Sequence, residues 1–155
     1  MSSDKEFVLA TMRKYGKMVA EDLQTRSTDM TGIEVIAEED FVPDFDPTRQ
    51  YLNYEAGYIC RSEAGNVVKL IQPYDSITYT QQPEELQSQW RFYWSTDPKK
   101  AKPFISKATS PYMTDDCCTY EGHVWRSGQD NNTWAPGTEN INWTDLGTIE
   151  SVIGA

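Results

Sequence analysis

The 155-residue sequence contains no apolar run of the roughly 18 to 20 residues that a membrane-spanning helix requires. Basic residues are few, since 14 Lys and Arg stand against 24 Asp and Glu, which gives a formal net charge of -10. Nucleic acids and anionic membranes are both bound through Lys and Arg. We therefore expect neither nucleic acid nor membrane as a partner. The start, MSSDKE, lacks the basic and apolar segments of a signal peptide, so we expect synthesis in a cytosol.

Cysteine and histidine are scarce, with Cys60, Cys117, Cys118 and a single His123. No CxxC pair or metal-ligand spacing occurs, so we predict no metal and no cofactor. The vicinal cysteines suit either small buried side chains or a thiol site. A thiol protease would need a third residue to orient His123, and no clear candidate is present. A glycosidase needs two carboxylates in a cleft, and the small β modules expected in this chain offer little room for one. We therefore expect a protein that is not an enzyme.

Apolar residues recur at helical spacing near the N-terminus. They are separated by four, three, four and four positions: Val8, Met12, Tyr15, Val19 and Leu23. This spacing predicts a helix over 1–26 with a stripe close to a heptad seam. A helix of this length with Gly16 in its middle is marginal alone. Its stripe therefore needs a partner, which is the rest of the chain, other copies of the chain, or a larger protein.

Composition divides the remaining chain into short segments. Residues 27–48 hold seven acidic residues and no basic one, which is typical of a solvated connector, with GIEVIA as one short strand. Strand-like runs such as AGYICRS and NVVKLIQP then alternate with turn residues. We predict a mainly β fold made of a helix (1–26), an acidic connector (27–44), a first antiparallel β module (45–94), a linker (95–110), a second antiparallel β module (111–149) and a tail (150–155).

The two β modules repeat one ordered pattern. It consists of a glycine, a hydrophobic strand, a proline and a tryptophan: Gly65, Val67, Val68, Pro83 and Trp90, then Gly122, Val124, Trp125, Pro136 and Trp143. In both copies the tryptophan follows the proline by seven residues. A hairpin of this size is barely stable alone, and a large aromatic side chain buries roughly 150–250 Å². We therefore assign Trp90 and Trp143 to packing within a duplicated unit.

The order G-x-V-[WY]-[RK], then P, then W resembles the small carbohydrate-binding modules of the chitin-binding type, families five and twelve. The resemblance covers 115–147 and, more loosely, 46–94. With AEEDFVPDFDP before the modules and STDPKKAKPF between them, the chain is similar to small proteins encoded near tail-fibre genes of phages and prophages of Gram-positive bacteria. This resemblance implies a non-catalytic virion protein, made in the bacterial host cytoplasm, that binds cell-surface polysaccharide in host attachment. The alternative is a structural decoration or assembly protein of the phage particle that binds no sugar.

The resemblance also implies how the N-terminal helix is used. The helix would dock on other phage structural proteins or join copies of the chain into a homo-oligomer, with a trimer as one candidate state.

In sugar-binding members of the family, exposed aromatic residues in the loop before the proline stack on sugar rings. Counting from Trp125, the family's exposed pair falls on Gln129 and Asp130, neither of which has a ring. Trp134 is the one aromatic residue in that loop. Its ring either faces solvent or packs on the neighbouring unit.

Polar side chains surround Trp134 in the sequence. Gln129, Asp130 and Asn132 could bind sugar hydroxyls or simply stabilise a turn. Tyr74 and Tyr79 occupy the corresponding loop of the first module, and Trp125 is more typical of core than of ligand contact. The candidate sugar-binding set is therefore Trp134, Trp125, Gln129, Asp130, Asn132, Tyr79 and Tyr74.

Overall fold

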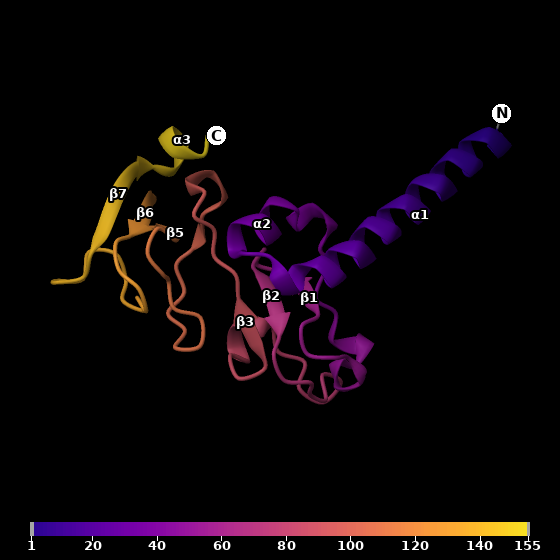
Figure 1. Ribbon diagram of the computed structural model, residues 1–155, viewed down its shortest axis with the longest axis horizontal. Helices are drawn as coiled ribbons and strands as arrows, with labels where there is room; N and C mark the ends of the chain where they lie inside the picture. Colours follow the sequence, from indigo (N-terminus) through magenta and orange to yellow (C-terminus); the bar gives the residue numbers. More distant parts are fainter. Residues whose placement is uncertain (1, 155) are drawn as a thin grey trace.

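The N-terminal helix α1 (Ser2–Arg26) extends well beyond the rest of the molecule in the computed structural model, which describes residues 2–154 (Figure 1). Met1 and Ala155, the outer ends of the predicted helix and tail, lie outside the described residues. The predicted N-terminal helix is confirmed. Its exposed half leads away from the two sheets, and only its C-terminal end joins the fold.

Two contacts fix the C-terminal end of α1. Leu23 is fully buried in a small core with side chains from the connector and first sheet: Val35, Ile36, Val42, Ile59 and Val67. The Gln24 amide pairs with the edge of the sheet, because its Nε2 donates to the Ile59 carbonyl at 2.7 Å and its Oε1 accepts from the Ile59 N–H at 2.8 Å. Gln24 thus satisfies two backbone groups of an edge strand that would otherwise lack partners.

The acidic connector folds into helical turns, so the predicted strand at GIEVIA is wrong. This segment is the helix α2 (Gly32–Ala37), and its Val35 and Ile36 face the core around Leu23. Glu34 Oε1 accepts from the Thr31 N–H at 3.1 Å, as in the T-x-x-E pattern that marks a helix start. A β-carbon at Gly32 would overlap the Trp94 carbonyl oxygen, so this position requires glycine.

Short helical turns complete the connections. They are η1 (Ser27–Asp29), η2 (Glu39–Phe41), η3 (Pro47–Arg49), η4 (Tyr51–Asn53), η5 (Pro83–Glu85) and η6 (Pro98–Lys100), with α3 (Ile149–Val152) near the C-terminus. The chain is 34% helical and 21% strand, so the mainly β prediction is not clearly confirmed. The coarser prediction, an N-terminal helix followed by two small sheets, is confirmed.

The first sheet is an antiparallel meander of β1 (Ile59–Arg61), β2 (Val67–Leu70) and β3 (Trp90–Phe92). The second contains β4 (Lys102–Pro103), β5 (Cys117–Tyr120), β6 (His123–Ser127) and β7 (Trp143–Thr148), in that order. Strands β5 to β7 are antiparallel, but β4 runs parallel to β5. Within the predicted second module, 111–149, the strands are thus antiparallel as expected, and the parallel strand β4 is added by the predicted linker 95–110.

The two meanders share their register as well as their strand order. Cys60 lies opposite Val68, and Cys118 lies opposite Trp125. The tryptophans match too, since Leu70 faces Trp90 and Ser127 faces Trp143. The residues that the sequence pattern aligns thus take equivalent positions in the two sheets.

One aromatic core runs through both sheets. It joins buried residues of the first module (45–94) and of the second module (111–149): Tyr51, Cys60, Val68, Leu70, Tyr74, Trp90, Phe92, Trp94, Tyr112 and Cys118. The predicted linker 95–110 contains η6 and β4. Phe104, which follows β4, stacks on Tyr112 with ring centroids 5.5 Å apart. A backbone hydrogen bond from Cys117 N to the Ser95 carbonyl, 2.9 Å, further joins this segment to the second sheet.

Candidate functional site

Each sheet has a long loop before its last strand, and each loop leaves one aromatic ring at the surface. The β2–β3 loop (71–89) exposes 56% of Tyr79, and the β6–β7 loop (128–142) exposes 48% of Trp134. The prolines of the repeat, Pro83 and Pro136, are buried beneath their loops. Figure 1 shows the orange β6–β7 loop at the left of the molecule, well separated from the first sheet. Of the predicted site residues, Tyr79 and Trp134 are therefore the two that offer a ring to a ligand.

Asn132 fixes the backbone next to Trp134. Its N–H and carbonyl form two 2.8 Å hydrogen bonds with the backbone of Tyr112. Its side chain, fully buried, donates from Nδ2 to Ser127 Oγ at 3.1 Å and accepts from the Trp134 N–H at 3.2 Å. The loop therefore turns around a buried amide immediately before the exposed ring.

Trp143 holds the other side of the same peptide. Its indole Nε1 donates to the Trp134 carbonyl at 2.8 Å. The Trp143 ring is itself packed edge-on against Phe104 and Tyr112, with centroids 6.2 and 5.5 Å away. Both backbone polar groups of Trp134 are thus bonded to fixed neighbours while its ring faces solvent. Such an arrangement limits the conformational entropy lost when a ligand stacks on the ring.

The polar residues predicted around Trp134 stabilise the loop instead. Gln129 Oε1 accepts from the Asn142 N–H at 3.0 Å. Asp130 Oδ1 accepts from the N–H and hydroxyl of Thr114, both at 2.9 Å, and these bonds lower the pKa of Asp130. Asn132 is enclosed and cannot reach a ligand. The alternative of a polar turn therefore fits these residues. Gln129 and Asp130 stay accessible as predicted ligand contacts, whereas the buried Asn132 is a loop anchor rather than a ligand contact.

Tyr79 borders a hollow of about 270 Å³ in the first module. Its other lining residues are Tyr74, Asp75, Leu86 and Gln89. Ligand pockets for drug-sized molecules span roughly 300–1,000 Å³, so this hollow suits one small ring. An apolar floor, an aromatic edge and two polar side chains meet here, which is the combination that a sugar ring needs.

Asp75 builds the turn that presents Tyr79. Its carboxylate accepts from the Thr78 N–H and hydroxyl at 3.2 and 2.6 Å and from Gln50 Nε2 at 2.9 Å, which together lower the pKa of Asp75. The Asp75 carbonyl accepts from the Tyr79 N–H at 3.0 Å. Sequence reasoning missed this residue, although an Asp three positions before a Thr is a recognisable turn signal. Leu86 and Gln89 carry no such signal.

Tyr74 and Trp125, also in the predicted set, belong mainly to the core. Tyr74 is 8% exposed, and its hydroxyl accepts from Trp90 Nε1 at 2.9 Å, so most of this side chain packs in the core and only a small part can reach the hollow that it lines. Trp125 is half-buried against the aromatic core and donates from Nε1 to the Tyr120 carbonyl at 3.2 Å.

The cysteines and the histidine do not form a reactive pair. Cys117 and Cys118 are buried, and burial raises the pKa of both thiols, that of Cys118 to about 12. A thiol with a raised pKa is a poor nucleophile at neutral pH. His123 lies at the hairpin end, opposite Tyr120, where its Nδ1 is 2.9 Å from Asp145 Oδ1. The alternative of small buried side chains therefore fits Cys117 and Cys118.

Residues 4–154 contain no group of three or more His, Cys, Asp or Glu side chains placed to hold a metal ion. Among the helices of the described chain, none has the length and apolar content needed to cross a bilayer.

Replacing Asn132 by alanine is expected to lower the free energy of unfolding by about 1–3 kcal/mol, because buried partners at Ser127 and Trp134 lose their hydrogen bonds. The 128–142 loop should also show faster backbone hydrogen exchange. Chemical denaturation followed by circular dichroism, with exchange mass spectrometry, measures both effects. The exposed Asn53→Ala is the control and should change neither. Unchanged exchange in Asn132→Ala would show that the loop is held by other contacts.

Comparison of the chain with protein-family models, curated proteins and solved structures found no match.

Proposed function

We propose that the protein is a non-catalytic glycan-binding protein of a phage or prophage particle, associated with its tail or fibre. It binds bacterial cell-surface polysaccharide through the β2–β3 and β6–β7 loops, in carbohydrate-binding-module-like repeats. One observation supports the binding role above all: two equivalent loops each expose a single aromatic ring on a hydrogen-bonded backbone, Tyr79 and Trp134. The sequence resemblance supports the virion assignment.

The chemistry of the loops suits sugars. The apolar face of a pyranose stacks on an aromatic ring, while amide and carboxylate groups bind its hydroxyls. At Tyr79 these groups are the Gln89 amide and the Asp75 carboxylate, because both residues line the same hollow. Each contact surface is small, so each site alone binds weakly. Two such sites on one chain favour a repeating polysaccharide over a single sugar, because the second contact becomes intramolecular.

Trp134→Ala is expected to weaken binding to purified Gram-positive cell walls by at least about tenfold. Truncation of a central tryptophan commonly removes about 2 kcal/mol or more of binding energy, and 1.4 kcal/mol is a factor of ten. Tyr79→Ala should weaken binding several-fold, and the double variant should lose most of it. Sedimentation of the protein with wall suspensions at graded concentrations measures these affinities.

The matched control is Phe41→Ala, which removes an exposed ring from η2, outside both loops. It should bind as the unmodified protein does. Equal binding by the unmodified protein and all four variants would show that the two loops do not bind the wall. No binding by the unmodified protein would show that the wall glycan is not its ligand. Circular dichroism confirms that each variant remains folded.

A second candidate function is a structural or assembly role in the particle without sugar binding. The observation that favours it is the exposed apolar face of α1, which has no partner within residues 4–154. In that case the rings at Tyr79 and Trp134 would contact another protein. Binding to assembled particles but not to cell walls would distinguish this role.

A further inference from the structure

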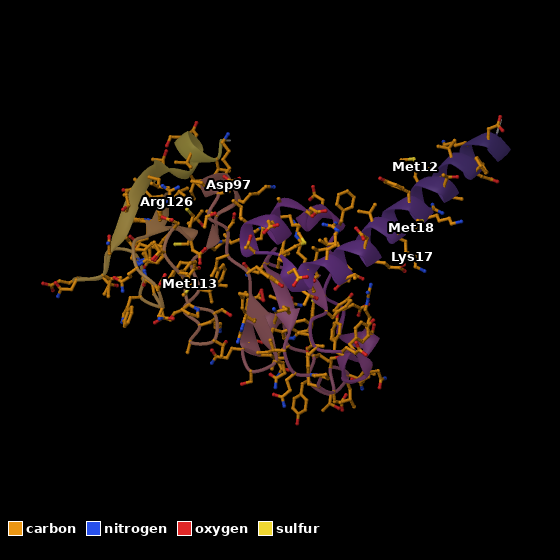
Figure 2. The ribbon with its side chains drawn as sticks, in the orientation of Figure 1. Met12, Lys17, Met18, Asp97, Met113 and Arg126 are labelled. Carbon is orange, nitrogen blue, oxygen red and sulfur yellow. The ribbon has the colours of Figure 1, made fainter. Side chains whose placement is uncertain are left out.

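The free part of α1 carries a concentration of exposed apolar side chains. Between residues 4 and 19, six large apolar residues are each 40% to 73% exposed: Phe7, Val8, Leu9, Met12, Tyr15 and Met18. Figure 2 shows Met12 and Met18 on the part of the helix that extends away from both sheets. Isolated helices of this length are marginal in water, and Gly16 weakens this one further. A covering partner would stabilise the segment.

The apolar stripe of α1 is continuous with the protein's own core. Val8, Met12, Tyr15 and Val19 follow one another by four, three and four positions, and Leu23 continues the same face after four more. Leu23 is fully buried in the core beneath α2, whereas Met12 and Tyr15 are uncovered. The face that packs at one end of α1 is therefore vacant over the rest of its length.

The spacing of this stripe is self-complementary. Alternation by four and three residues places Val8 and Tyr15 at one seam position, and Met12 and Val19 at the other, as in helices that pack against copies of themselves. The four positions flanking the seam, occupied by Leu9, Thr11, Gly16 and Met18, carry no charge. Copies aligned in parallel would thus meet no like charges beside their seam.

Between Val8 and Val19 the charged residues of α1 lie away from the seam, and Asp22, one heptad after Tyr15, ends it on the C-terminal side. Glu6, Arg13, Lys14, Lys17 and Glu21 occupy the outer positions of the same heptads. Lys5 ends the seam at the N-terminal side, where a long side chain can reach water. This division between an apolar seam and a mixed-charge outer face fits a helix covered by other helices.

Association requires a sizeable exposed apolar area. A stable interface buries roughly 800 Å² per partner. Five of the six apolar side chains lie on or beside the seam, and Phe7 falls on the outer face, one heptad before Lys14. The Tyr15 ring alone is worth about 150–250 Å² when covered. The stripe also widens to Leu9 on one side and Met18 on the other, which suits a bundle better than a narrow two-stranded seam. The free segment of α1 spans only about 24 Å at 1.5 Å per residue. A wide apolar stripe therefore has to supply contact area that a longer, narrower seam would otherwise provide.

We propose that α1 packs in parallel against α1 of further copies of this chain, along a seam of Val8, Met12, Tyr15 and Val19, and that the protein is an oligomer held by its N-terminal helices. This inference does not rest on glycan binding. An oligomer would carry several copies of the β2–β3 and β6–β7 loops and so raise their joint affinity for a polysaccharide.

The test is the mass of the full chain in solution, measured by sedimentation equilibrium over a wide concentration range. The unmodified protein should be an oligomer, and Met12→Glu should raise its dissociation constant at least about a hundredfold, because the new carboxylate would be desolvated in the seam. Lys17→Gln changes the net charge by the same amount on the outer face and should leave the mass unchanged. A monomer at every concentration, or equal dissociation by both variants, would overturn the proposal.

Thiol cross-linking tests the parallel arrangement. Tyr15→Cys should cross-link to itself, since parallel copies bring equal positions together, whereas Lys14→Cys should not. The three native cysteines are buried and provide no competing surface thiol. Cross-linking only in a mixture of Tyr15→Cys with Met12→Cys would indicate antiparallel helices and contradict the proposal. Association that weakens at high salt would do so too, because it would indicate docking through Arg13, Lys14 and Lys17.

Discussion

Replacement of Trp90 by alanine is expected to lower the free energy of unfolding by about 3–5 kcal/mol, as for other buried tryptophans truncated to alanine. Trp90 is fully buried, and three aromatic rings meet it edge-on: Phe45 at 5.8 Å, Tyr51 at 5.2 Å and Tyr74 at 6.1 Å. Alanine would open a cavity among these rings and leave the Tyr74 hydroxyl without its Trp90 donor. Since small domains are stable by about 5–15 kcal/mol, Trp90→Ala would lose a large share of the total free energy of unfolding.

The duplicated position supplies the matched comparison. Trp143 is equivalent to Trp90 in the register of the sheets but is only half-buried. Trp143→Ala should therefore cost less, about 1–3 kcal/mol. Trp90→Phe, which keeps a ring and loses the hydrogen bond, should lie between the two. Urea denaturation followed by far-ultraviolet circular dichroism measures all three variants. Equal losses at Trp90 and Trp143 would show that the difference in burial does not set the contribution of each tryptophan to stability.

The features that could be predicted from the sequence are those with a local period or a repeated order. The stripe from Val8 to Leu23 indicated α1, and the repeated Gly-Val-Pro-Trp order located two similar sheets. Strand β4 could not be predicted, because two residues at Lys102 and Pro103 carry no periodicity and pair with β5 only in the folded chain. The helix α2 had a local signal in Thr31 and Glu34, but the acidic composition and the β-branched Val35 and Ile36 favoured another interpretation.

Exposure at the candidate site depended on tertiary packing. Trp125 and Trp134 are nine positions apart in one module, yet the first contributes to the core and the second faces solvent. The sequence separates them only as a strand residue and a loop residue. In the folded chain Trp125 lies on β6 and packs on the aromatic core, whereas the backbone of Trp134 is held by Asn132 and Trp143. The burial of Asn132 also could not be predicted from the local sequence. A polar residue in a polar loop is expected at the surface, but this one is buried because its amide completes the turn.

Glu39→Gln is expected to lower the free energy of unfolding by about 2–4 kcal/mol, since removing one partner of a buried ion pair leaves the other charge uncompensated. The Glu39 side chain is 7% exposed, and its Oε1 is 2.6 Å from the Lys102 ammonium, itself 16% exposed. Arg61 and Lys100 approach the same carboxylate at 3.7 and 3.9 Å. These cations come from β1, η6 and β4, so a single carboxylate from the connector ties both sheets together.

The neighbouring Asp40 allows the role of burial to be separated from that of charge. Asp40→Asn removes the same charge from a side chain that is 89% exposed and lies 3.8 Å from Arg61. Exposed ion pairs contribute little, so the loss should stay below about 1 kcal/mol. The Glu39 effect should also persist in high salt, because buried pairs are screened far less than exposed ones. Chemical denaturation of both variants at low and high salt measures these losses. Comparable losses at the two positions would show that net charge, rather than the buried carboxylate, stabilises the junction of the connector with the two sheets.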